Sequence, residues 1–310
     1  MYKRQNNEYG IDKYELMPDS PKRQVVIGSG PIRIGQGIEF DYGCVHAVKS
    51  IREHGDEAII INNNPETVST DFDTSNRLYF EPLSIEFVIE ILLRERAYGI
   101  LLQFGGQTAI NLALPLEKRM GILEKAGLNL KLLGTSIDAI DEASDRERFE
   151  EFSRKNGLKM PRGLTGKTSK EVRNAVDKIG FPVLIRPSYV LGGRGMEVLT
   201  NDKQLDAYLS EAYITPEKPI LIDQYLSHAT ELDVDAVSDG KDVLVGAIME
   251  HLEEAGIHSG DSTCFIPTQN ISKEILKIVE EQTKIIGIGL TIVGCFNIQF
   301  AIQDNELYVL

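Results

Sequence analysis

The sequence has few of the residues that build disulfide frameworks or metal centres. Its 310 residues include three cysteines, Cys44, Cys264 and Cys295, which are widely separated and show no C-x-x-C spacing. Their odd number and their spacing argue against a disulfide framework and against a cysteine-based zinc site. The five histidines contain no H-E-x-x-H pattern, so a histidine-based zinc site is not indicated either.

Long apolar runs and clusters of basic residues are also lacking. No apolar run approaches the roughly 20 residues that span a bilayer, and residues 1–21 are polar, unlike a signal peptide or an anchor. The sequence has 33 Lys and Arg against 47 Asp and Glu, which gives a formal net charge of -14. We therefore expect a cytoplasmic protein with no nucleic-acid or membrane partner. Any phosphate site would have to be built locally, from a few arginines and backbone N–H groups.

The length and the ordinary content of 42% hydrophobic residues predict two domains. We expect residues 1–22 to be a linker with little structure, residues 23–140 to form a first domain and residues 141–310 to form a second. In the first, short apolar segments such as 24–28 and 99–104 alternate with helical patterns. This alternation predicts an α/β domain with a parallel sheet covered on both faces.

The second domain has a different pattern. A charged helix is predicted at 143–156 and an amphipathic helix at 170–179. In the segment 231–237, three acidic residues alternate with apolar ones, which is typical of a strand with one solvated face. In the segment 295–302, alternate residues are apolar and would share one face of a strand, and Gln299 would lie on the opposite, polar face. The layout is α+β, with antiparallel sheets.

The glycine turn at residues 28–35 follows a predicted strand, as a dinucleotide-binding turn would. Its spacing is not G-x-G-x-x-G, and Pro31 removes a backbone donor. In dinucleotide sites an acidic residue further along the chain binds the ribose, and the sequence after residues 28–35 lacks the context expected for it. We therefore disfavour a dinucleotide-dependent oxidoreductase. The pattern G-x-x-x-x-G-K-[ST] is missing as well, which excludes a Walker-type phosphate loop.

Residues 186–195 are the most informative stretch. Arg186 follows a predicted strand and precedes the pair Gly192-Gly193. Paired glycines leave backbone N–H groups open to phosphate oxygens, and the fork of the arginine can bind the same oxygens. The alternative is a hairpin with a solvated arginine, and these residues alone favour neither interpretation.

Two further features also have two interpretations. The glycine-flanked loop at residues 256–262 is either a functional loop or a plain connecting turn, and we do not interpret His258 as a metal ligand. Gln299 is either an oxygen ligand for a Mg²⁺ ion held partly by nucleotide phosphates, or a surface side chain.

Seven stretches together resemble the carbamoyl-phosphate synthase large chain, over roughly residues 23–310 and in the same order. Within two of these stretches, the sequences RIGQGIEFDY and SYVLGGRGM are similar to the C-terminal synthetase half of that large chain. The stretches are Gly28–Tyr42, Asn62–Asp73, Gln103–Asn111, Asp145–Phe149, Arg186–Met196, Met249–Ser262 and Asn297–Ala301.

The resemblance implies a Rossmann-like pre-ATP-grasp domain followed by an ATP-grasp fold. It also implies a reaction, in which ATP phosphorylates carbamate to carbamoyl phosphate with Mg²⁺ or Mn²⁺, in arginine and pyrimidine biosynthesis. The implied partners are carbamate or a bicarbonate-derived substrate, the other synthetase half and a glutaminase small chain. Phosphoryl transfer needs positioning and charge neutralisation more than a covalent nucleophile, which agrees with the lack of an evident Ser/His/Asp triad.

The resemblance also implies site residues, position by position. Arg186 and Gln299 would be catalytic, both in contact with ATP, and Gln299 would ligate the metal. The remaining implied ATP contacts are Arg146, Gly192 and Gly193 of a phosphate-covering loop, Gln224, Leu226 and Glu231 around adenine and ribose, and Gly256, Ile257, His258 and Ser259.

The pattern departs from the family at its end. In the family a Glu and an Asn, spaced E-x-N, complete the metal site, and this sequence stops at Leu310, before that Glu. A hairpin turning at Asp304-Asn305 would place residue 310 or 311 across from Gln299. We therefore expect the second domain to be incomplete and this fragment to be inactive. Two alternatives stay open, another ATP-grasp carboxylate ligase such as a biotin carboxylase, and a catalytically dead nucleotide-binding scaffold.

Overall fold

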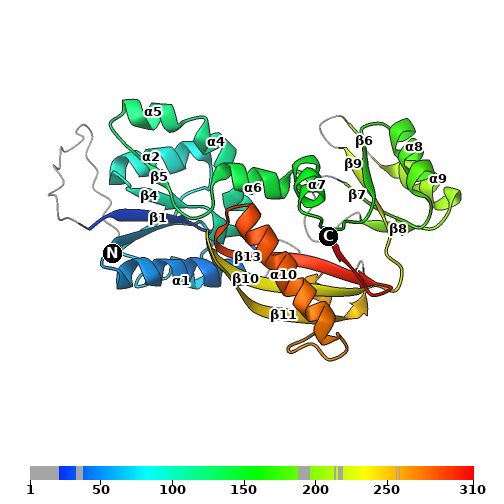
Figure 1. Cartoon of the computed structure of the whole chain (residues 1–310). Helices are drawn as coiled ribbons and strands as arrows, with labels where there is room; N and C mark the ends of the chain where they lie inside the picture. The colour runs from blue at the N-terminus through cyan, green and yellow to red at the C-terminus, as the bar shows by residue number, and fades with distance from the viewer. Residues whose placement is uncertain are drawn as a thin grey trace. The chain divides into compact units, whose positions relative to one another are not determined.

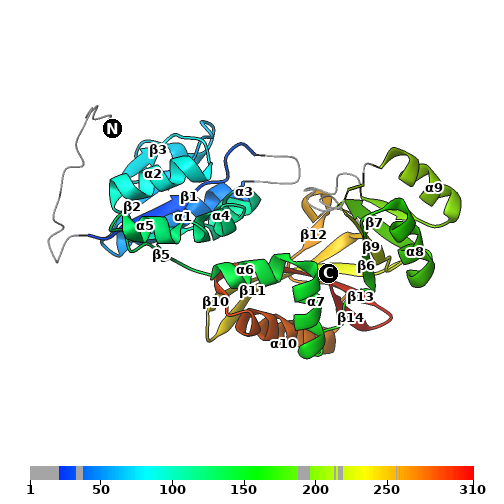
Figure 2. The same cartoon turned by 90° about the horizontal axis from the view of Figure 1, so that it is seen from above.

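The chain divides into two compact units, Met1–Asp141 and Glu142–Leu310. Figure 1 shows its elements, and Figure 2 shows them after a turn of 90°. The predicted linker, residues 1–22, lies almost entirely outside the described residues. The computed structural model describes residues 21–32, 38–187, 196–212, 214–215, 219–255, 257 and 259–310, without the side chains of Pro187, Glu254 and Ser259.

The first unit is built on a five-stranded parallel sheet of order β3-β2-β1-β4-β5. This confirms the predicted parallel sheet, although the strand predicted at 99–104 is shorter because the chain turns into a 3-10 helix. The strands are β1 (Arg23–Ile27), β2 (Glu57–Ile61), β3 (Arg77–Tyr79), β4 (Gly99–Leu101) and β5 (Lys131–Leu132). The helices are α1 (Glu39–Glu53), η1 (Val68–Thr70), α2 (Ile85–Glu95), η2 (Gln103–Gly105), α3 (Gly106–Ile110), α4 (Ala113–Glu117), α5 (Met120–Lys125) and α6 (Ile137–Ser144).

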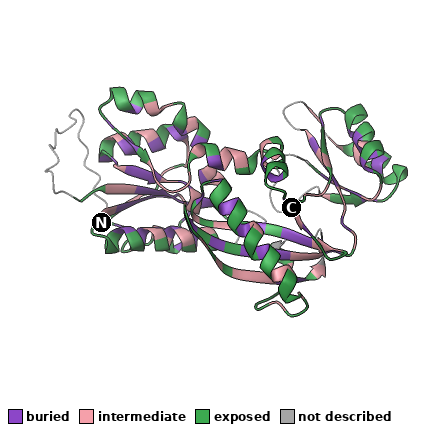
Figure 3. Ribbon diagram, viewed as in Figure 1, coloured by how far each residue is buried: buried purple, intermediate pink, exposed green. Residues whose placement is uncertain are grey.

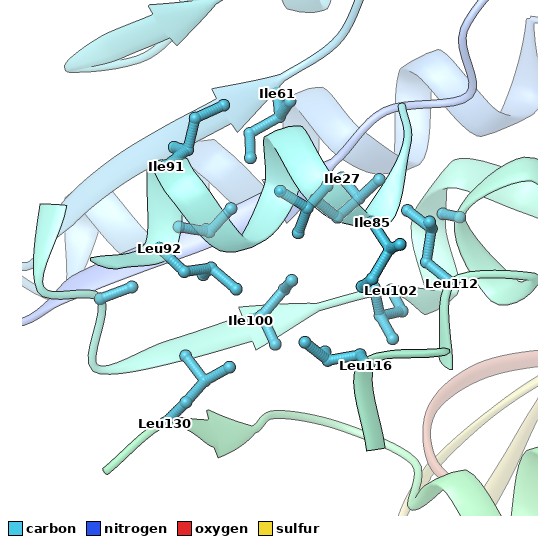
Figure 4. Packing of buried hydrophobic residues seen from close by; sticks show 14 of the residues in the cluster. Ile27, Ile61, Ile85, Ile91, Leu92, Ile100, Leu102, Leu112, Leu116 and Leu130 are labelled. Atoms are coloured by element: carbon cyan, nitrogen blue, oxygen red, sulfur yellow. The ribbon is translucent and has the colours of Figure 1, made fainter. Parts of the chain in front are cut away.

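Strand β1 is buried on both faces, because its alternate side chains enter two apolar clusters. Val25 and Ile27 pack against α2 and the helices that follow it, while Val26 packs against α1. Figure 4 shows the first of these clusters, in which Ile85 of α2 lies near Ile27. A parallel sheet covered on two sides needs such continuous apolar strands, and Figure 3 shows buried residues along them.

The second unit contains two antiparallel sheets, of order β12-β11-β10-β13-β14 and β6-β9-β7-β8. The strands are β6 (Gly163–Gly166), β7 (Val183–Pro187), β8 (Glu197–Leu199), β9 (Ile220–Gln224), β10 (Thr230–Asp239), β11 (Val243–Glu254), β12 (Cys264–Phe265), β13 (Val293–Gln303) and β14 (Glu306–Val309). The helices are α7 (Arg146–Lys155), α8 (Ser169–Ile179), α9 (Asp202–Glu211), η3 (Ser259–Asp261) and α10 (Lys273–Gly289).

Each sheet of the second unit is packed against helices on one face. Helix α10 lies along the five-stranded sheet (Figure 1) and covers Leu232, Val234 and Phe300. Helices α8 and α9 pack on the four-stranded sheet. The apolar stripe predicted for 170–179 is confirmed, since Val172 and Val176 are buried in that cluster. Within the described residues, no helix combines the length and the apolar character needed to cross a membrane.

The helix predicted at 143–156 is confirmed as α7, Arg146–Lys155, but it begins three residues later than predicted, because α6 ends just before it at Ser144. Asp145 separates them. Its backbone is extended, with φ -82 and ψ 119, and its side chain accepts a hydrogen bond from the backbone N of Arg148. A carboxylate at this position satisfies an N–H group that the first turn of α7 leaves unpaired. The N-cap therefore fixes the start of the helix that carries Arg146.

The last two strands form a tight hairpin. Asp304 and Asn305 both have positive φ, 52 and 63, which is the pattern of the two-residue turns that match the twist of antiparallel strands. Beyond the turn, the backbone N of Leu310 donates to the carbonyl of Gln299 at 3.0 Å. The predicted placement of residue 310 across from Gln299 is confirmed. On the other edge of β14, the N of Val309 donates to the carbonyl of Lys159 at 2.8 Å.

We predict that Cys44 resists alkylation in the folded chain. Its side chain is fully buried, and this burial, with a smaller effect of Asp41, raises the pKa of the thiol to about 12. The thiolate is the reactive form, so at pH 8 roughly one molecule in ten thousand would carry it. Unfolding should return the pKa to near 8.5 and restore reactivity.

The measurement is the mass gained after brief iodoacetamide treatment at pH 8, with and without urea. Cys295, which is exposed, serves as the internal reference. We expect Cys44 to be modified only in urea. Modification of Cys44 in the native chain as fast as that of Cys295 would contradict the burial of its side chain between α1 and the sheet.

Candidate functional site

The arginines predicted to bind ATP meet at one carboxylate. Arg146 comes from the first turn of α7, and its Nη2 contacts Oδ1 of Asp223 on β9. Arg186 stands near the end of β7, the strand beside β9, with its Nε 3.6 Å from Oδ2 of the same residue. The Asp223 side chain is only 10% exposed, whereas that of Arg186 is 46% exposed. Two cations and one anion leave a net charge of +1 here, which suits an anionic ligand.

Sequence reasoning missed Asp223, although it lies beside the predicted Gln224. It lies next to last in the apolar strand β9, and the end of a strand is an ordinary place for a polar residue. The two arginines that it joins are 77 and 37 positions away in the sequence. The pairing of β7 with β9, which sets Leu184 opposite Asp223, brings Arg186 near this carboxylate, and the first turn of α7 brings Arg146. A carboxylate held by two guanidinium groups fixes their position before any ligand arrives.

The segment after β9 contributes to a buried apolar cluster that begins three residues after Asp223 in the sequence. Gln224 is the last residue of β9, and its side-chain Oε1 accepts from Nε of Arg162 at 3.3 Å. Leu226 is buried in a small cluster with three alanines. The partly buried Tyr308 completes this cluster, whose alanines are Ala229, Ala255 and Ala301. One leucine packed among small side chains makes a compact apolar cluster that follows β9 directly.

A second polar group lies on β10 and β11, and its central residue was not predicted. His251 is buried, with Nε2 at 2.9 Å from Oδ2 of Asp233. Its Nδ1 lies 3.7 Å from Oε2 of Glu231. The expectation that the acidic residues of 231–237 form a solvated face is therefore wrong for Asp233, which is buried. The histidine comes from the neighbouring strand and covers it, a contact that alternation within one strand does not reveal.

Gln299 lies next to this group. It pairs in register with Asp233 across β13 and β10, and its side chain is exposed, as the alternation predicted. It offers one neutral amide oxygen. The part of the chain that the structure describes contains no group of three or more His, Cys, Asp or Glu arranged to hold a metal ion. Gln299 alone would supply one oxygen, so a Mg²⁺ ion bound here would take most of its oxygen ligands from the phosphates of a bound nucleotide.

The structure describes only some of the residues predicted to contact ATP along the two glycine-containing segments. Gly192, Gly193, Gly256 and His258 lie outside the described residues. Ile257 is 46% exposed, and the backbone of Ser259 begins η3. The loop that contains the paired glycines joins β7 to β8, which pair antiparallel.

The glycine turn of the first unit is filled by the protein's own side chain. The N–H of Gly30 donates to Oδ1 of Asn62 at 3.0 Å, and the Nδ2 of Asn62 donates to Oγ of Ser69 at 3.0 Å. A Cβ at Gly28 would run into the Asn62 side chain. In a dinucleotide site, backbone N–H groups of this turn would face a pyrophosphate. In this structure the N–H group of Gly30 is instead bonded to a side chain of the same unit.

Comparisons with known families and sequences agree over nearly all of residues 20–310. The family described as carbamoyl phosphate synthase preATP-grasp domain matches residues 20–142, and the family described as carbamoyl-phosphate synthase L chain, ATP binding domain, matches residues 145–310. The chain is 54% identical over 297 residues to a carbamoyl phosphate synthase large chain of Methanoregula boonei, covering 96% of this chain and 28% of that protein. It is 53% identical over 290 residues to the C-terminal section of such a large chain in Aquifex aeolicus, covering 93% and 52%.

Solved structures share the fold at low sequence identity. An N5-carboxyaminoimidazole ribonucleotide synthetase of Thermus thermophilus superposes with a TM-score of 0.67 at 16% identity, covering 93% of this chain and 69% of that one. The biotin carboxylase domain of a Hydrogenobacter thermophilus 2-oxoglutarate carboxylase, solved with MgADP and bicarbonate, gives 0.67 at 17%, covering 92% and 62%. These likenesses establish the ATP-grasp architecture and nothing further.

We predict that Asp223 and Arg146 are energetically coupled. Asp223→Asn and Arg146→Met should each destabilise the second unit, and in the double variant the losses should not add. We expect a coupling of about 1.5–3 kcal/mol, the usual range for a hydrogen bond between charged groups with little exposure. The measurement is urea unfolding of the four proteins.

The exposed pair Lys159 and Glu306 provides the control. A surface ion pair contributes little, because water and salt screen it. A cycle through Lys159→Met and Glu306→Gln should therefore show little coupling. Equal couplings in the two cycles would remove the special role assigned to Asp223.

Proposed function

The chain belongs to the carbamoyl-phosphate synthase large-chain family, and on this premise we propose that it binds ATP and carries the carbamate phosphorylation step. An oxygen of carbamate would attack the γ-phosphorus of ATP, forming a new P–O bond while the bond to ADP breaks. The products are carbamoyl phosphate and ADP. The observation that supports this best is the pair of arginines held on Asp223 beside the apolar cluster around Leu226.

The residues of the second unit suit the parts of ATP. Arg146 and Arg186 would bind phosphate oxygens, because a guanidinium fork matches them in shape and charge. Gln224 and Leu226 would frame the adenine, and Glu231 would accept hydrogen bonds from the ribose hydroxyls. The remaining proposed contacts, along the two glycine-containing loops, are Gly192, Gly193, Gly256, Ile257, His258 and Ser259.

We further propose that Mg²⁺ or Mn²⁺ accompanies the nucleotide, with Gln299 as a protein ligand. When bound, such an ion neutralises charge on the phosphates. Asp233 and His251 would help to position Gln299 from the strands beside it, because Asp233 pairs with Gln299 in register. Their 2.9 Å contact fixes the side chains of the neighbouring strands, so that the amide of Gln299 faces a defined surface.

The wider setting is also a proposal, because the chain spans 28% of one relative and 52% of another. A whole enzyme of this family would add the other synthetase half and a glutaminase small chain, and would take carbamate or a bicarbonate-derived substrate. We place it in the cytoplasm, in arginine and pyrimidine biosynthesis. The sequence identity of 54% favours this assignment over a biotin carboxylase, with which the chain shares only the fold.

The reaction can be tested by exchange of segments. Residues 23–310 of this chain would replace the matching segment of the Aquifex aeolicus protein, and both proteins would be supplied with ADP, carbamoyl phosphate and Mg²⁺. We expect the exchanged protein to form ATP at a rate within about tenfold of its parent, because the exchanged segment contains all the proposed site residues. Loss of ATP formation with retained nucleotide binding would favour the alternative of a nucleotide-binding scaffold. Bicarbonate-dependent ATP cleavage that needs biotin would favour a biotin carboxylase.

We predict that Arg186→Ala weakens ATP binding without destabilising the fold. Its guanidinium is half exposed and lies 3.6 Å from Asp223, so its loss should change the melting temperature little. Removing a charge-assisted contact to phosphate should lower the affinity roughly ten- to hundred-fold. Calorimetric titration with ATP provides the measurement.

Arg173→Ala is the matched control. Arg173 is exposed to the same degree, 45%, and pairs with Asp206 between α8 and α9. It lies on a helix, away from the proposed site, and its loss should leave the ATP affinity unchanged. An Arg186→Ala protein that binds ATP as tightly as the Arg173→Ala protein would show that Arg186 does not face the phosphates.

A further inference from the structure

The connection between β11 and β12 is tied at its base by one carboxylate. Glu253, near the end of β11, accepts three hydrogen bonds from the far side of the connection. Oγ of Ser262 donates to its Oε2 at 2.7 Å, the N of Thr263 donates to the same atom at 2.6 Å, and Oγ1 of Thr263 donates to Oε1 at 3.2 Å. The hydrogen bond of Ser262 and those of Thr263 also lower the pKa of this carboxyl group. Glu253 is therefore an anionic anchor that closes the connection.

The same connection has a second tie, on its other side. The hydroxyl of Tyr225 donates to the carbonyl of Ala255 at 2.8 Å. Tyr225 lies between Gln224 and Leu226, the residues proposed to frame adenine, and its backbone N donates to the carbonyl of Pro182 at 3.1 Å. Ala255 is buried in the cluster of Leu226. The hydroxyl thus links the adenine-side segment directly to the strand end from which the connection leaves.

We propose that Tyr225 and Glu253 are positioning residues that together hold the Ala255–Thr263 connection against the adenine-side segment. The proposal rests on the proposed function, because the connection carries residues assigned to the nucleotide. Neither side chain needs to touch the ligand. Tyr225 holds the carbonyl of Ala255, where the connection starts, and Glu253 holds Ser262 and Thr263, where it returns, so both ends are fixed.

Strand β11 offers a matched comparison for Glu253. Glu250, three residues earlier, also accepts three hydrogen bonds from a following segment. The donors are the N of Gln269 at 2.6 Å, the N of Asn270 at 2.9 Å and Nδ2 of Asn270 at 2.8 Å. That segment leads into α10 and carries no proposed nucleotide contact. The two glutamates therefore share strand, chemistry and number of partners, and differ in the segment that they anchor.

The test is calorimetric titration of ATP into the purified chain and its variants, with the melting temperature measured in parallel. Tyr225→Phe removes only the hydroxyl, and Glu253→Ala removes the anchor. Each should weaken ATP binding about threefold to tenfold, the effect of one or two lost hydrogen bonds. Glu253→Gln keeps an oxygen acceptor and should recover part of the affinity. The double variant should lose less than the product of the single losses, because both changes release the same connection.

Two controls separate positioning from general destabilisation. Glu250→Gln should lower the melting temperature and leave the ATP affinity within twofold of the parent. Tyr208→Phe, which removes a hydroxyl at the α9 packing surface, should change neither. The proposal is overturned if the parent chain binds ATP and both site variants bind it within twofold, or if Glu250→Gln weakens binding as much as Glu253→Ala. A parent chain that shows no saturable ATP binding would instead count against the proposed function.

Discussion

Two guanidinium groups share one carboxylate in the second unit, and this contact organises the candidate site. The chain carries a formal net charge of -14, so a site for a polyanion must concentrate positive charge against the average. Arg146 and Arg186 meet on Asp223, whereas the acidic residues Glu231 and Asp233 lie around His251. The separation leaves one region with excess positive charge and another with carboxylates. A nucleotide with its phosphates near the arginines and its ribose near Glu231 would match both.

The architecture of the second unit makes this separation possible. The antiparallel pairing of β7 with β9 sets Arg186 and Asp223 on adjacent strands. The other sheet sets Asp233 opposite Gln299. Leu226 and Ala229 lie between Asp223 and Glu231 in the sequence, and their cluster contains Ala301, the strand partner of Glu231. The charged groups therefore rest on strands with buried neighbours, which keeps their positions defined without a bound ligand.

Much of this arrangement could be predicted from the sequence, because periodicity reports burial within one element. The parallel sheet, the apolar stripe of α8 and the exposed position of Gln299 all followed from it. Contacts between elements could not be predicted in the same way. Asp233 looked solvated because nothing in its own strand shows that His251, 18 residues later, covers it. Asp223 was overlooked because its partners come from other elements. Asp145 shows a third case, in which a capping residue readable in the sequence places the helix start at residue 146 and not at the predicted residue 143.

Amide hydrogen exchange with and without ADP tests the central claim most directly. If the nucleotide binds where the arginines and the Leu226 cluster meet, ADP should slow exchange at residues 220–226 and in the Ala255–Thr263 connection. Exchange in the first unit, including the glycine turn at 28–32, should stay nearly unchanged. Protection confined to that turn, with none at 220–226, would contradict the account, because it would place the nucleotide on the parallel sheet.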